Sequence, residues 1–528
     1  MPRSYSIVIR NGLVFDGTGQ APVQADIGID DDTIRAVGNI KGAVGLTEVD
    51  ASNRYVAPGF IDLTNHSDTH WTLFDEPRQE SLITQGITTI VGGNCGTSLA
   101  PLVTASDIEG IQKWTDISRI NINWQGVGEL LGAQDAVPLG VNVATLVGHG
   151  TLRRAVRMDI TKPATPDAIA AMDALLRRSL DEGAFGLSTG LGRSFGLSAE
   201  HDELETLFAS VRHANALTTH HLSDEGAGIT AAVSRIAGAL RETGATGHIS
   251  HFKALGRKSW PLGRSALDVI ENARSGGVSL TIDVFPYTRT GSNLYMLLPE
   301  WALEGGRAHI LARLENPAMR TAIADALRAL TLHYDRMVIA STLHDVGAVG
   351  HTIAQLASRA ESAAEEVMLE LLRTNQLHVS VFNEAISEDG MAEALMQPYA
   401  AVASDGVGQG ETRRPNDLPH PRSFGAFPRA INLFVKERRS VAWKDMIQKM
   451  TGLPATILGL RKRGWIRPGM AADIVIFDPE TIRDRSDYVE ARVFSSGIQW
   501  VFINGVAAIA DGEITRDLSG RALRRSNT

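Results

Sequence analysis

The middle of the chain alternates between short apolar runs and longer stretches with helical periodicity. We interpret eight of the apolar runs as strands, at 60–64, 88–92, 143–148, 185–189, 217–221, 247–251, 280–283 and 402–405. Strands separated by helical stretches favour βα units in a parallel sheet, and eight units are the number that closes a (β/α)8 barrel. The pattern therefore predicts an α/β fold based on a TIM-type barrel.

One helical stretch carries its own start and stop signals. Thr165 is a capping residue, Pro166 suits the first helical position, and Gly183 ends the stretch. The apolar side chains between them recur at helical spacing and form one face, at Ile169, Met172, Leu175, Leu176 and Leu180. We expect a helix here, followed at once by the strand at 185–189.

The two ends of the chain have a different pattern. Residues 7–14 read as strand, Asn11-Gly12 turn and strand, and 25–37 reads as a second hairpin. Strand-like runs return at 472–477 and 501–506. We therefore expect a small β-sandwich domain from 1–56 plus 460–528, around a catalytic barrel at 57–459.

A segment at about 290–377 is too long for one βα connection. It contains helical stretches at 307–314 and 363–372, so we interpret it as a helical insertion in the barrel. Two interpretations of its role stay open. It could act as a lid over the site, or it could be a helical excursion far from the site.

Composition narrows the functional classes. The 528 residues include 43% hydrophobic ones and a net charge of −9 without a clustered basic stripe, which argues against nucleic acid as a partner. No apolar run is long enough to cross a membrane, and a single cysteine excludes an internal disulfide. These features predict a cytoplasmic protein that neither binds nucleic acid nor enters a membrane, and they leave its oligomeric state open.

Polar side chains gather where the predicted strands end, which is the rim where barrel enzymes keep their chemistry. They are His66, Cys95, His149, Ser188, His221, His251, Asp283 and Asp405. A lone buried cysteine is usually inert. At a strand end shared with histidines, however, Cys95 becomes a candidate zinc ligand, because thiolate and imidazole are the donors that zinc prefers.

Several motifs resemble those of N-acyl-D-amino-acid deacylases (D-aminoacylases) in the amidohydrolase superfamily. The resemblance covers nearly the whole chain, and its motifs begin with Pro-Gly-Phe-Ile-Asp at 58–62 and end with Ala-Asp-Ile-Val at 472–475. Between these lie the motifs at 93–101, 147–153, 186–191 and 420–425. The resemblance implies a zinc-dependent hydrolase of amide bonds.

The resemblance also implies roles for single residues. Cys95, His221 and His251 correspond to the ligands of a tightly bound zinc, with His221 preferred over its neighbour His220. Asp405, in Ser-Asp-Gly, corresponds to the general base that takes a proton during attack and returns it to the leaving nitrogen. The alternative for Asp405 is a capping role in the turn that follows.

Substrate contacts follow from the same comparison of motifs. Lys253 and Arg422 match positions that bind the substrate's α-carboxylate, although each could instead be a salt-bridge partner. Tyr287 matches a tyrosine near the reacting carbonyl, where it could stabilise an oxyanion. Ser188 is counted with the substrate-binding residues, and His149 either lines the pocket or is structural.

Three positions depart from the family pattern. The family has His-x-His at the end of the first strand, whereas this chain has Thr64 and keeps only His66, so a second zinc loses a ligand. We expect one tightly bound zinc, with His66 as an optional ligand or a neighbour of the ligands. Ser223 replaces an arginine, and Arg193 stands where a tyrosine is typical, as a candidate contact for an acidic substrate.

The leading hypothesis is a zinc-dependent amidohydrolase that cleaves a linear carboxamide, converting an N-acyl (D-)amino acid to a free amino acid and a carboxylate. The first alternative is hydrolysis of another C–N bond, in a neutral, aryl or cyclic amide. The second is a catalytically silent relative that binds a metabolite. The sequence leaves the acyl group and the D or L preference open.

Overall fold

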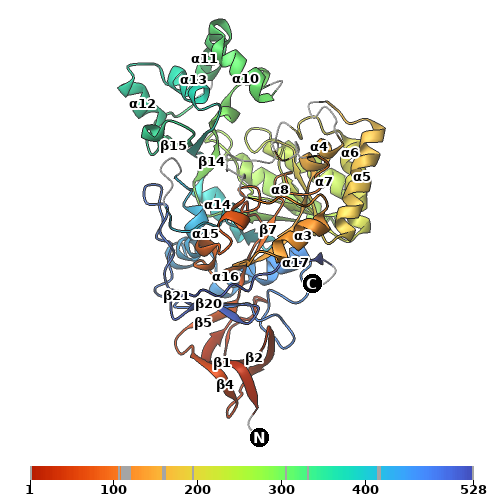
Figure 1. Ribbon diagram of the computed structural model, residues 1–528, viewed down its shortest axis with the longest axis vertical. Helices are drawn as coiled ribbons and strands as arrows, with labels where there is room; N and C mark the ends of the chain where they lie inside the picture. The colour runs from red at the N-terminus through yellow and green to blue at the C-terminus, as the bar shows by residue number, and fades with distance from the viewer. Residues whose placement is uncertain are drawn as a thin grey trace.

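The computed structural model describes residues 3–104, 108, 120–156, 162–192, 195–303, 306–329, 332–412 and 418–525. Figure 1 shows an elongated molecule with three regions. Strands from both chain ends form its lower part, α/β units form the central body, and a group of helices lies at the top.

The lower region is one nine-stranded sheet that combines the two ends of the chain. Its order is β21-β20-β19-β18-β5-β1-β2-β3, with β4 beside β1. Its first strands are β1 (Ser4–Val14), β2 (Val23–Asp30), β3 (Thr33–Gly38), β4 (Val44–Asp50) and β5 (Tyr55–Pro58). Its last strands are β18 (Ile474–Phe477), β19 (Ile498–Ile503), β20 (Val506–Ala510) and β21 (Glu513–Ile514). The antiparallel pairing of β5 with β18 joins the two ends.

The predicted turn at Asn11-Gly12 is wrong. Both residues lie inside the single strand β1, where Arg10 and Asn11 form a bulge opposite Asp26 and Gly12 pairs with Ala25 in β2. Asn11 has a left-handed φ of 58°. A Cβ on Gly12 would lie 2.4 Å from a methyl group of Val56, so the glycine allows β5 to approach closely. By contrast, the hairpin expected at 25–37 is confirmed as β2 and β3.

The central body contains two parallel sheets. One has the order β6-β7-β8 and the other β17-β13-β12-β11-β10-β9. Their strands are β6 (Phe60–Asp62), β7 (Ile87–Gly92), β8 (Asn142–Thr145), β9 (Val147–Gly148), β10 (Gly186–Gly190), β11 (Leu217–His221), β12 (Thr246–Ile249), β13 (Leu280–Val284) and β17 (Ala400–Val402). All eight predicted runs overlap these strands, although β17 begins two residues before its predicted run.

The two parallel sheets are continuous with one another at both ends. Only Leu146 separates β8 from β9 along the chain. At the other end the Asp405 amide donates to the Thr64 carbonyl at 2.9 Å, and the His66 amide donates to the Gly406 carbonyl at 2.9 Å. The segments that follow β6 and β17 therefore pair side by side.

Helices connect these strands and cover the sheets in Figure 1. They are α1 (Thr72–Asp75), α2 (Glu80–Ile83), α3 (Val127–Asp135), α4 (His149–Ala155), α5 (Pro166–Asp181), α6 (His201–His213), α7 (Ile229–Thr243), α8 (Leu262–Ser275), α14 (Glu388–Met396), α15 (Arg422–Ala430), η4 (Ile431–Glu437), α16 (Trp443–Met450) and α17 (Gly452–Leu458). The helix expected after Thr165 is confirmed as α5, and the Thr165 hydroxyl accepts from the Ala168 amide.

The upper region is the insertion, and it contains strands as well as helices. A three-stranded antiparallel sheet consists of β14 (Arg289–Asn293), β15 (Met337–Thr342) and β16 (Val379–Glu384). Its helical elements are η2 (Leu294–Leu297), α9 (Glu300–Leu303), α10 (Gly306–Glu315), α11 (Pro317–Ala329), η3 (Val346–Ala348), α12 (Ile353–Arg359) and α13 (Ala364–Thr374). They enclose a hydrophobic cluster of their own. Both predicted helices are confirmed, while the three strands were not predicted.

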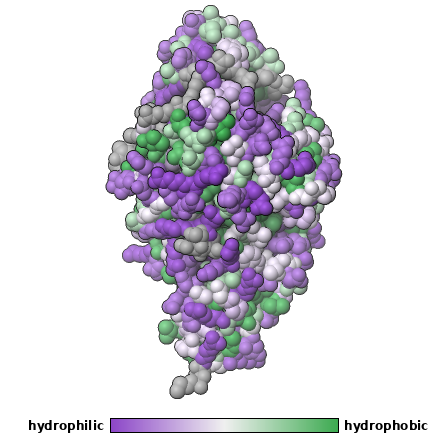
Figure 2. Space-filling view, turned by 90° about the vertical axis from the view of Figure 1, so that its right-hand side faces the viewer, coloured by the Kyte–Doolittle hydropathy of each residue, from purple (hydrophilic) through white to green (hydrophobic). Residues whose placement is uncertain are grey.

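On the face shown in Figure 2, hydrophilic side chains predominate and apolar ones form small separate groups. Among the described residues, none of the helices has both the length and the apolar character needed to cross a bilayer.

A buried polar network fastens the nine-stranded sheet to the central body. The Arg463 guanidinium pairs with Asp473 and donates to the Asn504 side chain at 2.7 Å. The amide group of Asn504 donates to Asn142, in β8, at 2.8 Å. Asn142 in turn donates to Asp473 at 3.3 Å. The network therefore gives Asp473, in the Ala-Asp-Ile-Val motif, a structural role.

We expect Arg463→Met to lower the free energy of unfolding by about 3–5 kcal/mol, because it leaves the Asp473 carboxylate buried without its cation. Urea unfolding followed by fluorescence measures the change. The matched control is Arg521→Met, because Arg521 and its partner Asp32 are 53% and 43% exposed. This variant should lose about 1 kcal/mol or less. Equal losses in the two variants would contradict the role given to Asp473.

Candidate metal centre and active site

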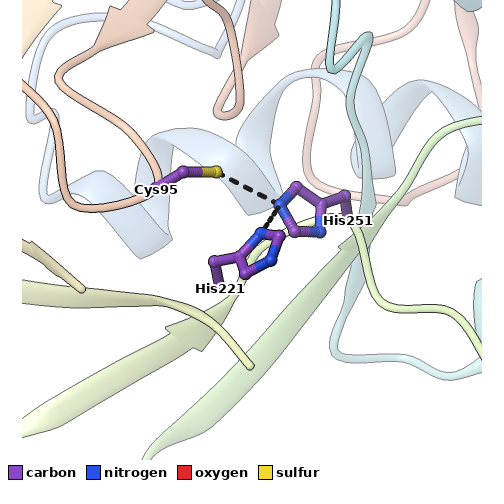
Figure 3. A group of neighbouring side chains, drawn as sticks. All are labelled: Cys95, His221 and His251. Carbon is purple, nitrogen blue, oxygen red and sulfur yellow. Dashed lines mark hydrogen bonds between the residues drawn. The ribbon is translucent and has the colours of Figure 1, made fainter. Parts of the chain in front are cut away.

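Three side chains from distant parts of the chain meet at one rim of the parallel sheets. Figure 3 shows one nitrogen of the His251 ring facing both the Cys95 sulfur and a nitrogen of His221. The Cys95 sulfur lies 3.2 Å from His251 Nε2, and His221 Nδ1 lies 2.9 Å from the same nitrogen. All three donor atoms lie within 4.8 Å of one another. Among the described residues, this is the one group of three that could hold a metal ion in this way.

Three of the site residues, which lie just after strands, have a left-handed backbone conformation that changes the direction of their side chains. Cys95, His251 and Asp405 have φ values of 53°, 43° and 48°. Such values are uncommon outside glycine, and they cost free energy that the surrounding structure must supply. Each residue follows a strand of the parallel sheets, so the turn redirects a side chain that would otherwise follow the alternation of the strand.

Hydrogen bonds fix the loop that carries Cys95. The Ser188 hydroxyl, at the middle of β10, accepts from the Gly96 amide at 3.0 Å and donates to the Gly93 carbonyl. Asp68 accepts from the Gly93 amide at 2.6 Å. Ser188 is fully buried. Its hydroxyl therefore holds the backbone on both sides of Cys95.

The donor set matches the chemistry of zinc. One sulfur and two imidazole nitrogens form a three-ligand set, which catalytic zinc sites combine with an open fourth position. Burial alone would raise the pKa of the Cys95 thiol. Charge on His251 and hydrogen bonds from His221, His251 and His66 outweigh burial and hold this pKa well below its usual range. The pocket therefore favours the thiolate, which is the form that binds metal.

The neighbouring histidines have other partners. His220 lies 2.9 Å from the Thr189 hydroxyl and 2.9 Å from the Thr218 hydroxyl. His248 contacts Asp283 at 2.9 Å. Burial lowers the pKa of His220 to about 3, so this ring stays neutral. The structure thus places His221, and not His220, beside Cys95 and His251.

Asp405 lies between a histidine and an arginine. One carboxylate oxygen is 3.0 Å from His66 Nε2, and the other accepts from Arg422 at 2.6 Å. Burial would raise the pKa of this carboxyl group. The charges of Arg422, His251 and His66 reverse that effect and keep the pKa well below its usual range. Asp405 is therefore held as a carboxylate, a state able to accept a proton.

Thr64 takes part in a buried network that reaches the backbone of His251. Its hydroxyl donates to Asp283 at 2.6 Å. Asp283 also accepts from the His251 amide at 2.5 Å. The residue that departs from the family pattern thus contacts the carboxylate that fixes the backbone of His251.

Both candidate substrate-binding cations are paired inside the protein. Lys253 Nζ lies 2.6 Å from Glu225, and Arg422 is bound to Asp405. The two cations also approach the same aromatic ring. The centre of the Phe285 ring lies 5.9 Å from Lys253 Nζ and 5.1 Å from the Arg422 guanidinium carbon. Both interpretations, substrate contact and salt bridge, are compatible with this geometry.

Of the remaining candidates for substrate binding, Tyr287 and His149 are buried and hydrogen-bonded inside the protein. The Tyr287 hydroxyl donates to the Pro421 carbonyl at 3.2 Å. His149 has no exposed surface and lies 2.6 Å from Glu203, which also pairs with Arg153. Arg193 falls outside the described residues.

Glu225 is the residue that sequence reasoning missed. Its carboxylate lies 3.1 Å from His251 Nδ1 as well as 2.6 Å from Lys253. The only signal in the sequence is its place four residues after His221, in the polar run 223–226. Such runs are usually solvated turns, so nothing local distinguished Glu225 from Asp224.

A family model described as the amidohydrolase family matches residues 47–273 and 415–515. The chain is 31% identical to the N-acyl-D-glutamate deacylase of Alcaligenes xylosoxydans xylosoxydans. That alignment covers 99% of this chain and 98% of the relative.

Two solved structures are similar over almost the whole chain. N-acyl-D-glutamate deacylase from Bordetella bronchiseptica was solved with zinc and a phosphonate inhibitor that mimics the tetrahedral intermediate. It has a TM-score of 0.83 and 31% identity, and covers 99% of this chain and 100% of that one. A D-aminoacylase, described as having a binuclear metal centre with one-metal activation and second-metal attenuation, has a TM-score of 0.82 and 28% identity. It also covers 99% of this chain and 100% of that one.

The ion cluster around His149 predicts a stability that depends on pH. Burial would raise the pKa of Glu203, but hydrogen bonds from Arg153 and His149 lower it to about 2. Its stabilising contribution is therefore complete above the unfolded pKa of about 4.5, and is lost as the pH falls towards 2. We expect Glu203→Gln to cost about 3–5 kcal/mol at pH 7.

Urea unfolding of the wild type and Glu203→Gln at pH 7 and at pH 3 measures this effect. The difference in the free energy of unfolding between the two proteins should be about 2 kcal/mol smaller at pH 3 than at pH 7, because at pH 3 the Glu203 carboxyl group is protonated in the unfolded chain. A difference that stays constant between these pH values would refute a depressed pKa at Glu203.

Proposed function

This chain belongs to the amidohydrolase family, and we propose that it is a zinc-dependent hydrolase that converts an N-acyl-D-amino acid to the free amino acid and a carboxylate. The observation that carries the proposal is the convergence of Cys95, His221 and His251 beside Asp405. It is supported by full-length similarity to deacylases of N-acyl-D-amino acids.

We assign Cys95, His221 and His251 as the zinc ligands. When bound there, zinc supplies a Lewis acid that polarises the amide carbonyl and makes water acidic enough to attack near neutral pH. We propose one tightly bound zinc per chain, because Thr64 donates to Asp283 and offers no imidazole for a second ion. His66 remains an optional ligand whose Nε2 faces Asp405.

Asp405 is assigned as the residue that moves the proton. Attack forms the new C–O bond while the Asp405 carboxylate accepts a proton from the attacking water. The same proton then passes to the amide nitrogen as the C–N bond breaks, because an unprotonated amine is a poor leaving group. Arg422 and His66 orient the carboxylate through its two oxygens.

Substrate recognition is assigned to the cationic side of the site. Arg422 and Lys253 would bind the α-carboxylate, with Arg193 as a contact for an acidic side chain. Tyr287 would stabilise the oxyanion once its hydroxyl exchanges the Pro421 carbonyl for substrate. Ser188 acts through the Cys95 loop, and His149 acts through the ion cluster with Glu203.

The same proposal includes the finer features of the fold. The two parallel sheets would form one closed (β/α)8 barrel at 57–459, since their strands are continuous at Leu146 and at the Thr64–Asp405 pairing. The small β domain of 1–56 plus 460–528 would be a β-sandwich around the shared sheet. We propose the cytoplasm as the compartment, because a chain whose one cysteine is free fits reducing surroundings.

We expect Asp405→Asn to retain zinc but lose turnover by a factor of about 10²–10⁴, because the amide side chain cannot accept the proton. Metal analysis of wild type and variant should give about one zinc per chain in both. Steady-state hydrolysis of an N-acetyl-D-amino acid measures the rate. Wild-type turnover in this variant would exclude Asp405 as the base.

A substrate panel tests recognition in the wild type. We expect N-acetyl-D-amino acids to exceed the matching neutral amides by about tenfold to a hundredfold in kcat/KM, because hydrogen bonds to charged groups contribute about 1.5–3 kcal/mol. The corresponding N-acetyl-L-amino acids and a set of aryl amides complete the panel. Equal rates on the neutral amide would favour hydrolysis of another C–N bond.

A further inference from the structure

Glu225 is the point where the proposed metal site and the proposed substrate site meet. Its oxygen Oε1 lies 3.1 Å from His251 Nδ1 and 2.6 Å from Lys253 Nζ. The three side chains are 9%, 3% and 8% exposed. This carboxylate is therefore shielded from water and shared by two residues with different proposed tasks.

The two nitrogens of His251 face different partners. Nε2 lies towards Cys95 and His221, whereas Nδ1 lies 3.1 Å from Glu225 and 2.9 Å from Lys253 Nζ. An imidazole that binds metal through Nε2 carries its proton on Nδ1. A carboxylate that accepts this proton fixes both the tautomer and the direction of the ring. Glu225 lies where such an acceptor is needed.

Local backbone brings Lys253 to the same oxygen. His251 has its left-handed φ of 43°, and Asp283 accepts from its amide. Lys253, two residues later, folds back so that its ammonium group donates to the His251 carbonyl at 3.0 Å. The Leu255 amide donates to the Glu225 carbonyl at 2.7 Å, which fixes the loop that carries the carboxylate.

On this geometry we propose that Glu225 is a positioning residue that serves both sites, orienting His251 for zinc and holding the Lys253 ammonium group towards the substrate's carboxylate. The inference rests on the proposed function for the role of Lys253, whereas its metal-binding half does not depend on the substrate. A salt bridge that only stabilises the fold would affect neither zinc affinity nor substrate preference.

The test uses Glu225→Gln, which keeps the shape of the side chain but removes its charge. We expect its dissociation constant for zinc, measured by competition with a chelator, to rise about 10- to 100-fold. We also expect its preference for an N-acetyl-D-amino acid over the matching neutral amide to fall about tenfold in kcat/KM, equivalent to about 1.4 kcal/mol. Circular dichroism of the metal-free variant verifies that it is folded.

Two further variants separate the two tasks. Lys253→Met should lose the substrate preference but keep wild-type zinc affinity, because His251 still has its carboxylate partner. Asp224→Asn is the matched control, since the Asp224 side chain accepts only from the Gly226 and Gly228 amides of its own loop among the hydrogen bonds of the described residues. It should keep both properties. Glu225→Asp, which retains the charge, should recover part of each property if Glu225→Gln folds poorly.

The outcomes distinguish this inference from the proposed function. Wild-type zinc affinity and substrate preference in Glu225→Gln would overturn it, and loss of only one property would overturn the claim that one carboxylate serves both. If the wild type itself shows no preference for a carboxylate, the proposed substrate is wrong. The claim that Glu225 serves the substrate site falls with it. A weakened zinc affinity in Glu225→Gln would then support an effect of this carboxylate on the metal site alone.

Discussion

The site depends on one constraint, which is that side chains from separate strand ends must turn to face a single point. Cys95, His251 and Asp405 face this point because each has a left-handed backbone conformation, and that conformation costs free energy. Ser188 and Asp283 compensate by binding the backbone at or beside two of these turns. The chemistry of the site therefore rests on hydrogen bonds made by side chains that do not themselves face the metal position.

Electrostatics link the groups that bind metal to those that move protons. His251 contacts the Cys95 sulfur, its charge lowers the pKa of Asp405, and its Nδ1 faces Glu225. Arg422 pairs with Asp405, and Lys253 pairs with Glu225. Both cations lie near the ring of Phe285. Buried charges of this kind are costly unless each has a partner, so the groups stabilise one another as a set.

The residues that join the nine-stranded sheet to the central body lie apart from the residues of the candidate site. The Asp473 and Arg463 network lies where the nine-stranded sheet meets β8. The insertion instead contacts the functional end, since the His420 ring lies 3.0 Å from the Arg289 carbonyl of β14. Its three-stranded sheet has a hydrophobic cluster of its own, and this arrangement lets it approach the site without belonging to the central core.

The sequence by itself determined the alternation of strands and helices, the strand-like runs at both chain ends, and the candidates Cys95, His221 and His251. These features are local, because apolar periodicity, caps and donor type are all written in neighbouring residues. Only the tertiary structure decided that Asn11 lies in a bulge and not in a turn, that Thr64 binds Asp283, and that Glu225 faces both His251 and Lys253. Each of these depends on partners brought close by packing, and local patterns carry no information about which distant residue will be the partner.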